Sequence, residues 1–318
     1  MKNIYSNIFS FNKKILNKSV INLKKGNVVG LPTETVYGLA GNAYSDRACK
    51  KIFKLKKRPK NNPLIVHYYN IQNLRKDCNF NDNFLKLYKR FSPGPITFIL
   101  DLKKNSKISK IVTNKKNSLA VRFPKHPVTR NLLKKLNFPL AAPSANLSSK
   151  ISAVSSSDVK EDFGKKIKYV LEGGKSSIGL ESTIIDLREK PKILRLGGLE
   201  ISNIQKALSK RILLNNNPKK ISAPGQLKIH YSPGIPIRLN VKKIKKDEAY
   251  LLLKKTKKTK FGYYFLSKNG NLNEAAKNLY STLRKIKKNN FKSIAVAKIP
   301  NKGLGKTIND RLNKASKF

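Results

Sequence analysis

The chain is poor in several residue types, and each shortage argues against a class of protein. It has no Trp, one Met, two Cys, three His and only 17 acids among 318 residues. Cys49 and Cys78 form no CxxC pair, so we expect reduced, structural thiols and a reducing compartment. The few His and Cys have no metal-ligand spacing, so the sequence predicts no metal site built by the protein.

Long apolar segments are also missing. No uninterrupted run approaches the roughly 18 residues that a bilayer-spanning helix needs. The first 16 residues have Lys between short apolar stretches and no small-residue cleavage site, so they do not read as a secretory signal. We therefore expect a soluble cytoplasmic protein with no membrane partner.

Cations, in contrast, are abundant. Lys and Arg number 69, which gives a formal net charge of +52. A balance this basic favours a polyanionic partner such as nucleic acid. However, the excess is mostly Lys spread along the whole chain with many Asn and Ile, as a genome rich in A and T would also produce. A binding stripe would concentrate Arg and interleave aromatic residues. Both a solvated surface and a polyanion-binding surface stay open at this point.

Helical and strand patterns alternate through the first two thirds of the chain. Apolar residues at helical spacing predict helices, and short apolar or alternating runs predict strands. This mixed order predicts one α/β domain that ends near residue 211. Helices are expected at 12–24, 46–58, 82–91, 127–136, 157–163 and 202–210, and strands at 27–31, 63–67, 96–102, 118–123, 140–142, 168–171, 182–187 and 193–196.

A segment rich in Asn, Pro and Gly follows at 212–236 and has the composition of an interdomain linker. His230 and Tyr231 are unusual residues for a mere spacer. Beyond it, residues 237–318 are expected to form a small second α/β unit, with strands near 249–253, 261–266 and 293–299 and a helix at 273–288. The predicted domains are therefore 1–211 and 237–318, joined by 212–236.

Two polar residues lie in predicted buried strands. Arg122 has apolar neighbours on both sides, and a buried guanidinium needs an anion to offset its desolvation. A ligand carboxylate would suit its two-pronged donor geometry, but an internal Asp or Glu would serve equally. His67 ends the strand at 63–67 and is either a satisfied core residue or a ligand contact.

Lys56 and Arg58 lie at the predicted end of a helix. Cations there complement the helix dipole while remaining solvated, which is the simpler interpretation. Phosphate binding is the alternative, because Pro59 and Pro63 fix the following loop and Asn62 adds an amide donor.

Other polar groups lie at predicted strand ends. Arg195 precedes Gly197, where backbone can approach a ligand closely. Ser144 and Asn146 follow a short strand, at the sheet edge where open α/β sheets bind ligands. Ordinary turn chemistry would also account for the Ser and the Asn.

Two segments resemble nucleotide-binding phosphate loops but do not fit the motif. GLGKT at 303–307 and GGKSS at 173–177 lack the upstream Gly of a phosphate loop, since Pro300 and Tyr169 occupy those positions. No nucleophile elbow is present, so a Ser-His-Asp hydrolase is not supported. Any metal is expected to be Mg²⁺ carried in on phosphates.

An ordered set of motifs covers nearly the whole chain. They are PTETVYGL at 32–39, KKRP at 56–59, NPLIVH at 62–67, SPGPITFIL at 92–100, LAVRFP at 119–124, AAPSANLS at 141–148, GLESTIID at 179–186, LRLGG at 194–198, APGQLKIHYSP at 223–233 and GLGKTINDRLNKAS at 303–316. Together they resemble the threonylcarbamoyl-AMP synthase family in its two-domain form. The resemblance implies a YrdC-like domain with a twisted mixed sheet and flanking helices, then a linker and a small Rossmann-like α/β domain.

The resemblance also implies an activity. L-Threonine, bicarbonate (or CO₂) and ATP would be joined into threonylcarbamoyl-AMP with release of pyrophosphate, for the N6-threonylcarbamoyladenosine modification of tRNA. Mg²⁺ would come with ATP, and Lys56 and Arg58 would be catalytic. The implied ATP-binding residues are Lys56, Arg58, Asn62, Ser118, Ser144, Asn146, Ser152, Arg195 and Tyr231. The implied L-threonine-binding residues are Thr35, His67, Arg122, Ala142 and Ser182.

The sequence departs mildly from the family pattern. Ser118 stands where Thr is frequent, Gln226-Leu227 where Met and a basic residue are frequent, and the C-terminal domain is short. The expected partners are the downstream tRNA threonylcarbamoyl-transfer machinery and, more weakly, double- or single-stranded RNA such as tRNA. The alternatives are an RNA-binding module without catalysis and a related enzyme that uses carbamoyl phosphate. The latter kind usually carries zinc-finger and acylphosphatase-like segments, for which this chain has neither the cysteines nor the length.

Overall fold

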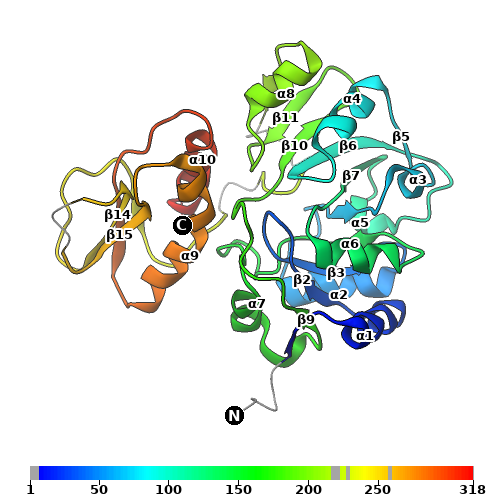
Figure 1. The fold of residues 1–318 in the computed structure, drawn as a ribbon, viewed down its shortest axis with the longest axis horizontal. Helices are drawn as coiled ribbons and strands as arrows, with labels where there is room; N and C mark the ends of the chain where they lie inside the picture. The colour runs from blue at the N-terminus through cyan, green and yellow to red at the C-terminus, as the bar shows by residue number, and fades with distance from the viewer. Residues whose placement is uncertain (1–6, 216–222, 227–229, 257–259, 318) are drawn as a thin grey trace.

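The computed structural model describes residues 7–215, 223–226, 230–256 and 260–317, which form two α/β units, each around its own sheet (Figure 1). Parts of the predicted linker, 216–222 and 227–229, lie outside the described residues, and so does the Leu227 noted above. The change from one sheet to the other falls between residues 214 and 237. The domain limits at 211 and 237 stay predictions.

A mixed sheet of twelve strands, counted over the described residues, forms the first unit. At its centre β4 (Ile65–His67) runs parallel to β7 (Ser118–Arg122), which is antiparallel to β6 (Ile96–Leu102). Next, β10 (Thr183–Asp186) is parallel to β6 and antiparallel to β11 (Lys192–Arg195). The strands that extend this sheet are β1 (Ile8–Phe9), β2 (Val29–Leu31), β3 (Gly38–Asn42), β5 (Cys78–Asn79), β8 (Leu140–Ala141), β9 (Val170–Leu171) and β12 (Leu213–Leu214). The predicted mixed sheet is confirmed.

Side-chain caps begin the helices where the sequence predicts them. Asn12 precedes α1 (Lys13–Lys24), Ser45 precedes α2 (Asp46–Lys56), and each side chain accepts a bond from the third backbone N–H beyond it. Lys57 ends α2 in the left-handed conformation, with φ of 50°. The other helices of this unit are α3 (Ile71–Leu74), α4 (Asp82–Phe91), α5 (Lys110–Thr113), α6 (Pro127–Lys134), α7 (Ser156–Phe163) and α8 (Ile201–Leu208), with a short 3₁₀ turn at Gly164–Lys166.

The two faces of the central sheet have different covers. One face, which carries Val66, Phe98 and Val121, packs against buried residues of α2, α4 and α8. The opposite face carries a small apolar cluster with a linker residue on top of it. Because side chains alternate along each strand, His67 and Arg122 share this second face. The members of the apolar cluster are Ile65, Ile99, Ala120, Ile184, Leu194 and Ala223.

Over its described residues, 230–256 and 260–317, the second unit is a four-stranded parallel sheet with two helices. The strand order is β13 (Ile237–Arg238), β16 (Ser293–Val296), β14 (Glu248–Lys254) and β15 (Tyr263–Ser267). Helices α9 (Leu272–Lys288) and α10 (Gly305–Ala315) lie on the side that faces the first unit (Figure 1). Their apolar residues share one buried cluster with Val36, Ile151, Val154 and Leu180 of the first unit. The predicted small α/β unit is therefore present, and its parallel sheet is compatible with a Rossmann-like fold.

The sequence did not predict β3, Gly38–Asn42. This strand contains Gly38 and Gly41 and lacks the apolar alternation that marks a strand. A Cβ on Gly41 would lie 3.2 Å from side-chain carbons of Ala48 and Ile52 on α2. The glycine therefore allows α2 to lie close to the sheet, which the local pattern does not reveal.

Candidate active site

A row of in-register residues crosses the central sheet. His67 on β4 lies opposite Arg122 on β7, which lies opposite Thr97 on β6. Thr97 lies opposite Ile184 on β10, and Ile184 lies opposite Arg195 on β11. Opposite residues of neighbouring strands point to the same face of a sheet, so this register places two arginines and a histidine on one face.

His67, Arg122 and Arg195 of this row line a single cavity. Arg58, from the loop after α2, and Tyr231, from the linker, line the same cavity. Residues from both predicted sets, ATP-binding and L-threonine-binding, therefore share one pocket. The predicted site residues that line it are Arg58, His67, Arg122, Ala142, Ser144, Ser182, Arg195 and Tyr231. The lining residues that the sequence reasoning did not assign are Thr33, Val36, Tyr37, Gly38, Ile65, Pro143, Glu181, Pro224, Gly225 and His230.

Arg122 has an acid of the protein beside it. Its Nη2 lies 2.8 Å from Oε1 of Glu34, and both side chains are buried. The other oxygen of Glu34 accepts a bond from the backbone N–H of Lys125 at 3.0 Å. Although burial raises the pKa of Glu34, the charge and hydrogen bond of Arg122 bring it below the ordinary value. An internal partner therefore exists, and Arg122 still lines the cavity.

His67 is buried, and its Nδ1 has no hydrogen-bond partner among the residues that the structure describes. Burial, together with the charge of Arg122, lowers the pKa of His67 well below its usual range. The imidazole is therefore neutral at physiological pH. A neutral ring at the cavity wall offers one acceptor and one donor, and it adds no positive charge beside Arg122.

Arg195 is held by backbone and by Ser182. Its Nε and Nη2 donate to the Ser182 carbonyl at 3.0 and 2.8 Å, and Nη2 also lies 3.1 Å from Ser182 Oγ. Its Nη1 donates to the carbonyl of Pro224 in the linker at 3.3 Å. The Oγ of Ser182 also pairs with Oγ1 of Thr97 at 2.7 Å. Burial lowers the pKa of Arg195, which remains a cation with a fixed orientation.

Arg58 lies in the loop after α2 and lines the cavity. It donates to the carbonyl and the side-chain oxygen of Asn62 at 3.0 and 2.6 Å and to the Pro63 carbonyl at 2.8 Å. Burial, followed by the charge of Arg195, lowers the pKa of Arg58 to about 9. The guanidinium is still protonated at neutral pH. An anion between Arg58 and Arg195 would relieve their repulsion.

Lys56 is neither solvated nor part of the cavity lining, so the simpler interpretation of it as an exposed cation at a helix end is wrong. It is 1% exposed, and its Nζ donates to the carbonyl of Ser144 at 2.6 Å and to that of Asn146. Burial lowers the pKa of Lys56 well below its ordinary value, with Arg58 as a second cause. Lys56 therefore fixes the turn that carries Ser144.

Five other predicted residues also lie outside the cavity lining. Thr35 Oγ1 pairs with Oγ1 of Thr33, a lining residue, at 2.8 Å. Ser152 donates to Glu181 at 2.6 Å. Asn62 supports Arg58, whereas Asn146 donates from its amide to backbone carbonyls of Leu147 and Lys150. Ser118 begins β7 opposite Asp101.

Glu181 is the site residue that the sequence reasoning missed with most consequence. It lines the cavity and accepts bonds from Ser152, from Tyr280 at 3.0 Å and from Arg311 Nε at 2.9 Å. Burial raises its pKa, but the charges of Arg311 and Arg195 outweigh this and lower it to about 2. The available signal was its place in the GLESTIID motif of a chain with only 17 acids.

The linker forms part of the cavity wall. Tyr231 has φ of 65° and is 1% exposed, and its ring lies 3.9 Å from that of His230. Within the described part of the chain, the Tyr231 hydroxyl has no hydrogen-bond partner, and Gly225 lies close enough that a Cβ there would be 3.1 Å from it. A buried hydroxyl at a cavity wall without a partner is a natural contact for a polar ligand.

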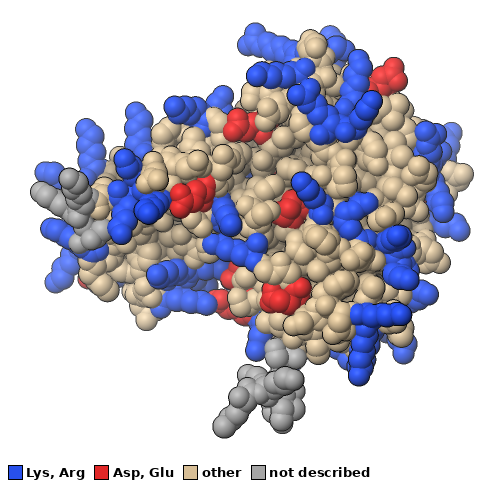
Figure 2. Space-filling view, viewed as in Figure 1, with Lys and Arg blue, Asp and Glu red and all other residues tan. Residues whose placement is uncertain are grey.

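Cationic side chains cover the surface widely. Figure 2 shows Lys and Arg over both units on the visible face rather than in one stripe. Over residues 7–215, 223–226, 230–256 and 260–317, no group of three or more His, Cys, Asp or Glu could hold a metal ion. Within the same residues, no helix is long and apolar enough to cross a membrane.

Family models match both parts of the chain. The model described as "Telomere recombination" matches residues 22–197, and the model described as "Threonylcarbamoyl-AMP synthase, C-terminal domain" matches residues 199–317. The fold and these matches define a two-domain α/β protein of the Sua5 type. The chain belongs to the threonylcarbamoyl-AMP synthase family.

Individual relatives agree with this assignment. The chain is 35% identical to the threonylcarbamoyl-AMP synthase of Pyrococcus abyssi, over 93% of this chain and 92% of that protein. It is 34% identical to that of Bacillus subtilis, over 92% and 90%. The crystal structure of P. abyssi Sua5 complexed with L-threonine superposes with a TM-score of 0.89 at 30% identity and covers 98% of both chains.

Proposed function

We propose that this chain condenses L-threonine, bicarbonate (or CO₂) and ATP to threonylcarbamoyl-AMP and pyrophosphate. The main support is that three guanidinium groups, from Arg58, Arg122 and Arg195, line one cavity beside a neutral His67. This arrangement suits two anionic ligands side by side, a carboxylate and a triphosphate. We place the activity in the cytoplasm and in the supply of an activated intermediate for tRNA modification.

The threonine end of the proposed site lies around Arg122. Its guanidinium would bind the substrate carboxylate, with Glu34 setting its orientation. His67, Ser182 and the backbone of Ala142 line the same cavity and would contact the amino and hydroxyl groups. Thr35 would act through its bond to Thr33.

The nucleotide end of the proposed site lies between Arg58 and Arg195. These two cations would bind the phosphates, and Ser144 and Tyr231 would contact ATP directly from the cavity wall. Lys56, Asn62 and Asn146 would act by supporting Arg58 and the turn at Ser144. Ser118 and Ser152 are proposed ATP-binding residues that lie outside the lining.

The proposed reaction needs no covalent intermediate with the protein. The threonine amine and CO₂ form a carbamate with loss of one proton (with bicarbonate, one water leaves instead), and an oxygen of the carbamate attacks the α-phosphorus of ATP. A P–O bond to the carbamate forms, the bond to the β-phosphate oxygen breaks, and pyrophosphate takes that electron pair. This is nucleotidyl transfer, which depends on positioning and charge stabilisation; Arg58 and Arg195 would provide the positive charge at the phosphates, while Lys56 would hold the turn at Ser144. Mg²⁺ would enter with the triphosphate as part of the substrate, because the protein's carboxylate in the lining, Glu181, is already engaged by Arg311 and Tyr280.

Pyrophosphate release measures this activity directly. The purified protein is incubated with ATP, Mg²⁺ and bicarbonate, with and without L-threonine, and labelled threonine reports threonylcarbamoyl-AMP. Release that depends on threonine supports the proposal, and release that ignores threonine contradicts it. Salt-sensitive tRNA binding without any ATP turnover would instead favour the RNA-binding alternative suggested by the basic surface.

A further inference from the structure

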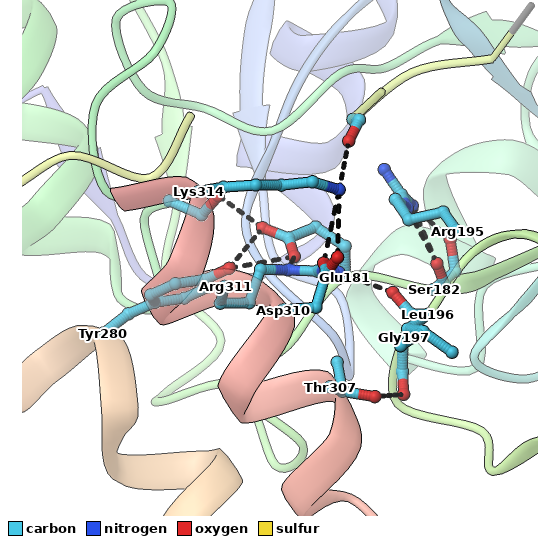
Figure 3. Close-up of polar contacts among 12 residues, drawn as sticks. Glu181, Ser182, Arg195, Leu196, Gly197, Tyr280, Thr307, Asp310, Arg311 and Lys314 are labelled. Carbon is cyan, nitrogen blue, oxygen red and sulfur yellow. Dashed lines mark hydrogen bonds and ion pairs between the residues drawn. The ribbon is translucent and has the colours of Figure 1, made fainter. Parts of the chain in front are cut away.

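Helix α10 of the C-terminal unit contacts the sheet side of the cavity (Figure 3). Arg311 donates from Nε to Glu181 at 2.9 Å and from Nη2 to the carbonyl of Leu196 at 2.6 Å. One turn earlier, Thr307 donates to the carbonyl of Gly197 at 3.1 Å. Leu196 and Gly197 directly follow Arg195, so α10 fixes the backbone that carries this cavity cation.

The same helix also contacts the linker. Lys314 Nζ donates to the carbonyl of Gly225 at 3.1 Å, and the backbone carbonyl of Lys314 accepts from the N–H of His230 at 3.4 Å. The guanidinium carbon of Arg311 lies 4.7 Å from the centre of the Tyr231 ring. The linker residues that line the cavity are therefore held by α10, and Arg195 also donates to the carbonyl of Pro224.

The charges in this contact are buried. The side chains of Arg311 and Glu181 are 1% and 7% exposed, and those of Lys314 and Asp310 are 5% and 9% exposed. Burying charges costs desolvation energy, and an apolar contact could join two domains with less cost. Such a cluster instead fixes orientation, because hydrogen bonds to charged groups are directional. Here the oriented groups are cavity residues.

We propose that Arg311 and Lys314 are positioning residues for the nucleotide, and that α10 thereby completes the ATP end of the cavity. Lys314 holds Gly225 and His230, and Arg311 holds Tyr231 and Glu181. The C-terminal unit thus sets the distance between the linker wall and Arg195. The inference rests on the proposed ATP site.

Lys314→Met tests this inference, because methionine keeps the packing and loses the donor. Binding of α,β-methylene-ATP, measured by calorimetry, is expected to weaken about tenfold, the equivalent of one lost hydrogen bond to a charged group. The KM for ATP should rise similarly, with kcat and the KM for threonine within about twofold. Lys314→Arg keeps a donor and should restore binding. Lys306→Met, an exposed position on the same helix, should leave binding unchanged.

The outcomes separate positioning from simple domain attachment. A purely structural role predicts a lower melting temperature and less active protein with an unchanged nucleotide Kd, and that result would overturn the inference. If Lys314→Met does not fold, Thr307→Val removes one bond from the same helix and should weaken nucleotide binding about threefold, whereas an unchanged Kd contradicts the idea. Wild-type protein that binds the analogue but makes no product would refute the proposed function alone.

Discussion

Glu34 and Arg122 form a buried pair at 2.8 Å, on two segments that lie 88 positions apart in the chain. The acid balances the guanidinium when no ligand is bound and also fixes its plane. A threonine carboxylate arriving at Arg122 would therefore meet a donor that is already oriented. Because Glu34 already balances the charge of Arg122 before a ligand binds, folding of the sheet does not depend on the substrate carboxylate.

Glu34→Gln is expected to raise the KM for L-threonine about tenfold with little change in the KM for ATP, because the amide orients Arg122 less firmly. Steady-state pyrophosphate release with each substrate varied in turn measures both constants. Glu248→Gln is the matched control, since it weakens a carboxylate–guanidinium pair with Arg238 far from the cavity. Equal changes in both constants would show that Glu34 does not act through Arg122.

Arg122→Ala and Arg58→Ala are expected to have opposite substrate profiles. Loss of Arg122 should lower kcat/KM for threonine about 10²–10³-fold, because it removes a buried charged contact. Loss of Arg58 should instead act mainly on ATP. Kinetics with one substrate saturating and the other varied distinguish the two. The roles are wrong if both variants impair both substrates to the same degree.

His230 is expected to make folding stability depend on pH. Burial lowers its pKa to about 3, whereas in the unfolded chain it titrates near 6.5. Between these values the unfolded state binds more protons, so the contribution is complete above pH 6.5 and is lost as the pH falls toward 3. From pH 7.5 to 5.0, wild type should lose about 2 kcal/mol more unfolding free energy than His230→Phe, measured by urea unfolding. If wild type and His230→Phe lose the same unfolding free energy over this pH range, His230 is not buried in its neutral form.

Gly197→Ala is expected to disturb the end of β11. A Cβ there would lie 2.3 Å from the backbone of Ser182 and Thr183, which cannot give way as a flexible side chain could. We expect a loss of about 3 kcal/mol of stability, together with weaker ATP use because Arg195 is displaced. In Gly41→Ala the nearest atoms are side-chain carbons at 3.2 Å, so about 1 kcal/mol or less is expected. Chemical denaturation and ATP kinetics on both variants test the difference.

Local signals predicted much of the fold. Asn12, Ser45 and Asn81 each accept a hydrogen bond from the backbone N–H three residues later. Because these caps are local, α1, α2 and α4 begin where the sequence indicates. Buried apolar runs likewise predicted β6 and β7. In contrast, β3 is built from small residues whose role is close packing against α2, and such packing depends on the partner element.

The site was predictable only in part. Arg122 stood out because a charged residue between apolar strand residues is conspicuous in sequence, and Arg195 because it precedes Gly197. The partners of Arg122 and Lys56 come from segments distant in the chain. Glu34 pairs with Arg122, and Lys56 donates to the carbonyls of Ser144 and Asn146. Glu181 was missed for the same reason, since its partners Tyr280 and Arg311 belong to the other unit.

The register between β4, β7 and β6 constrains how this enzyme can change. Sliding β7 by one residue would turn Arg122 toward the helix-packed face and bring Val121 to the substrate side. The same one-residue shift would bury the charge of Arg122 in the apolar core and place Val121 in the polar cavity. Both changes would destabilise the fold as well as the site. A single-residue insertion that slides β7 would therefore disturb the packing of the sheet together with the site, whereas the loops and the linker that line the cavity can vary without moving this register.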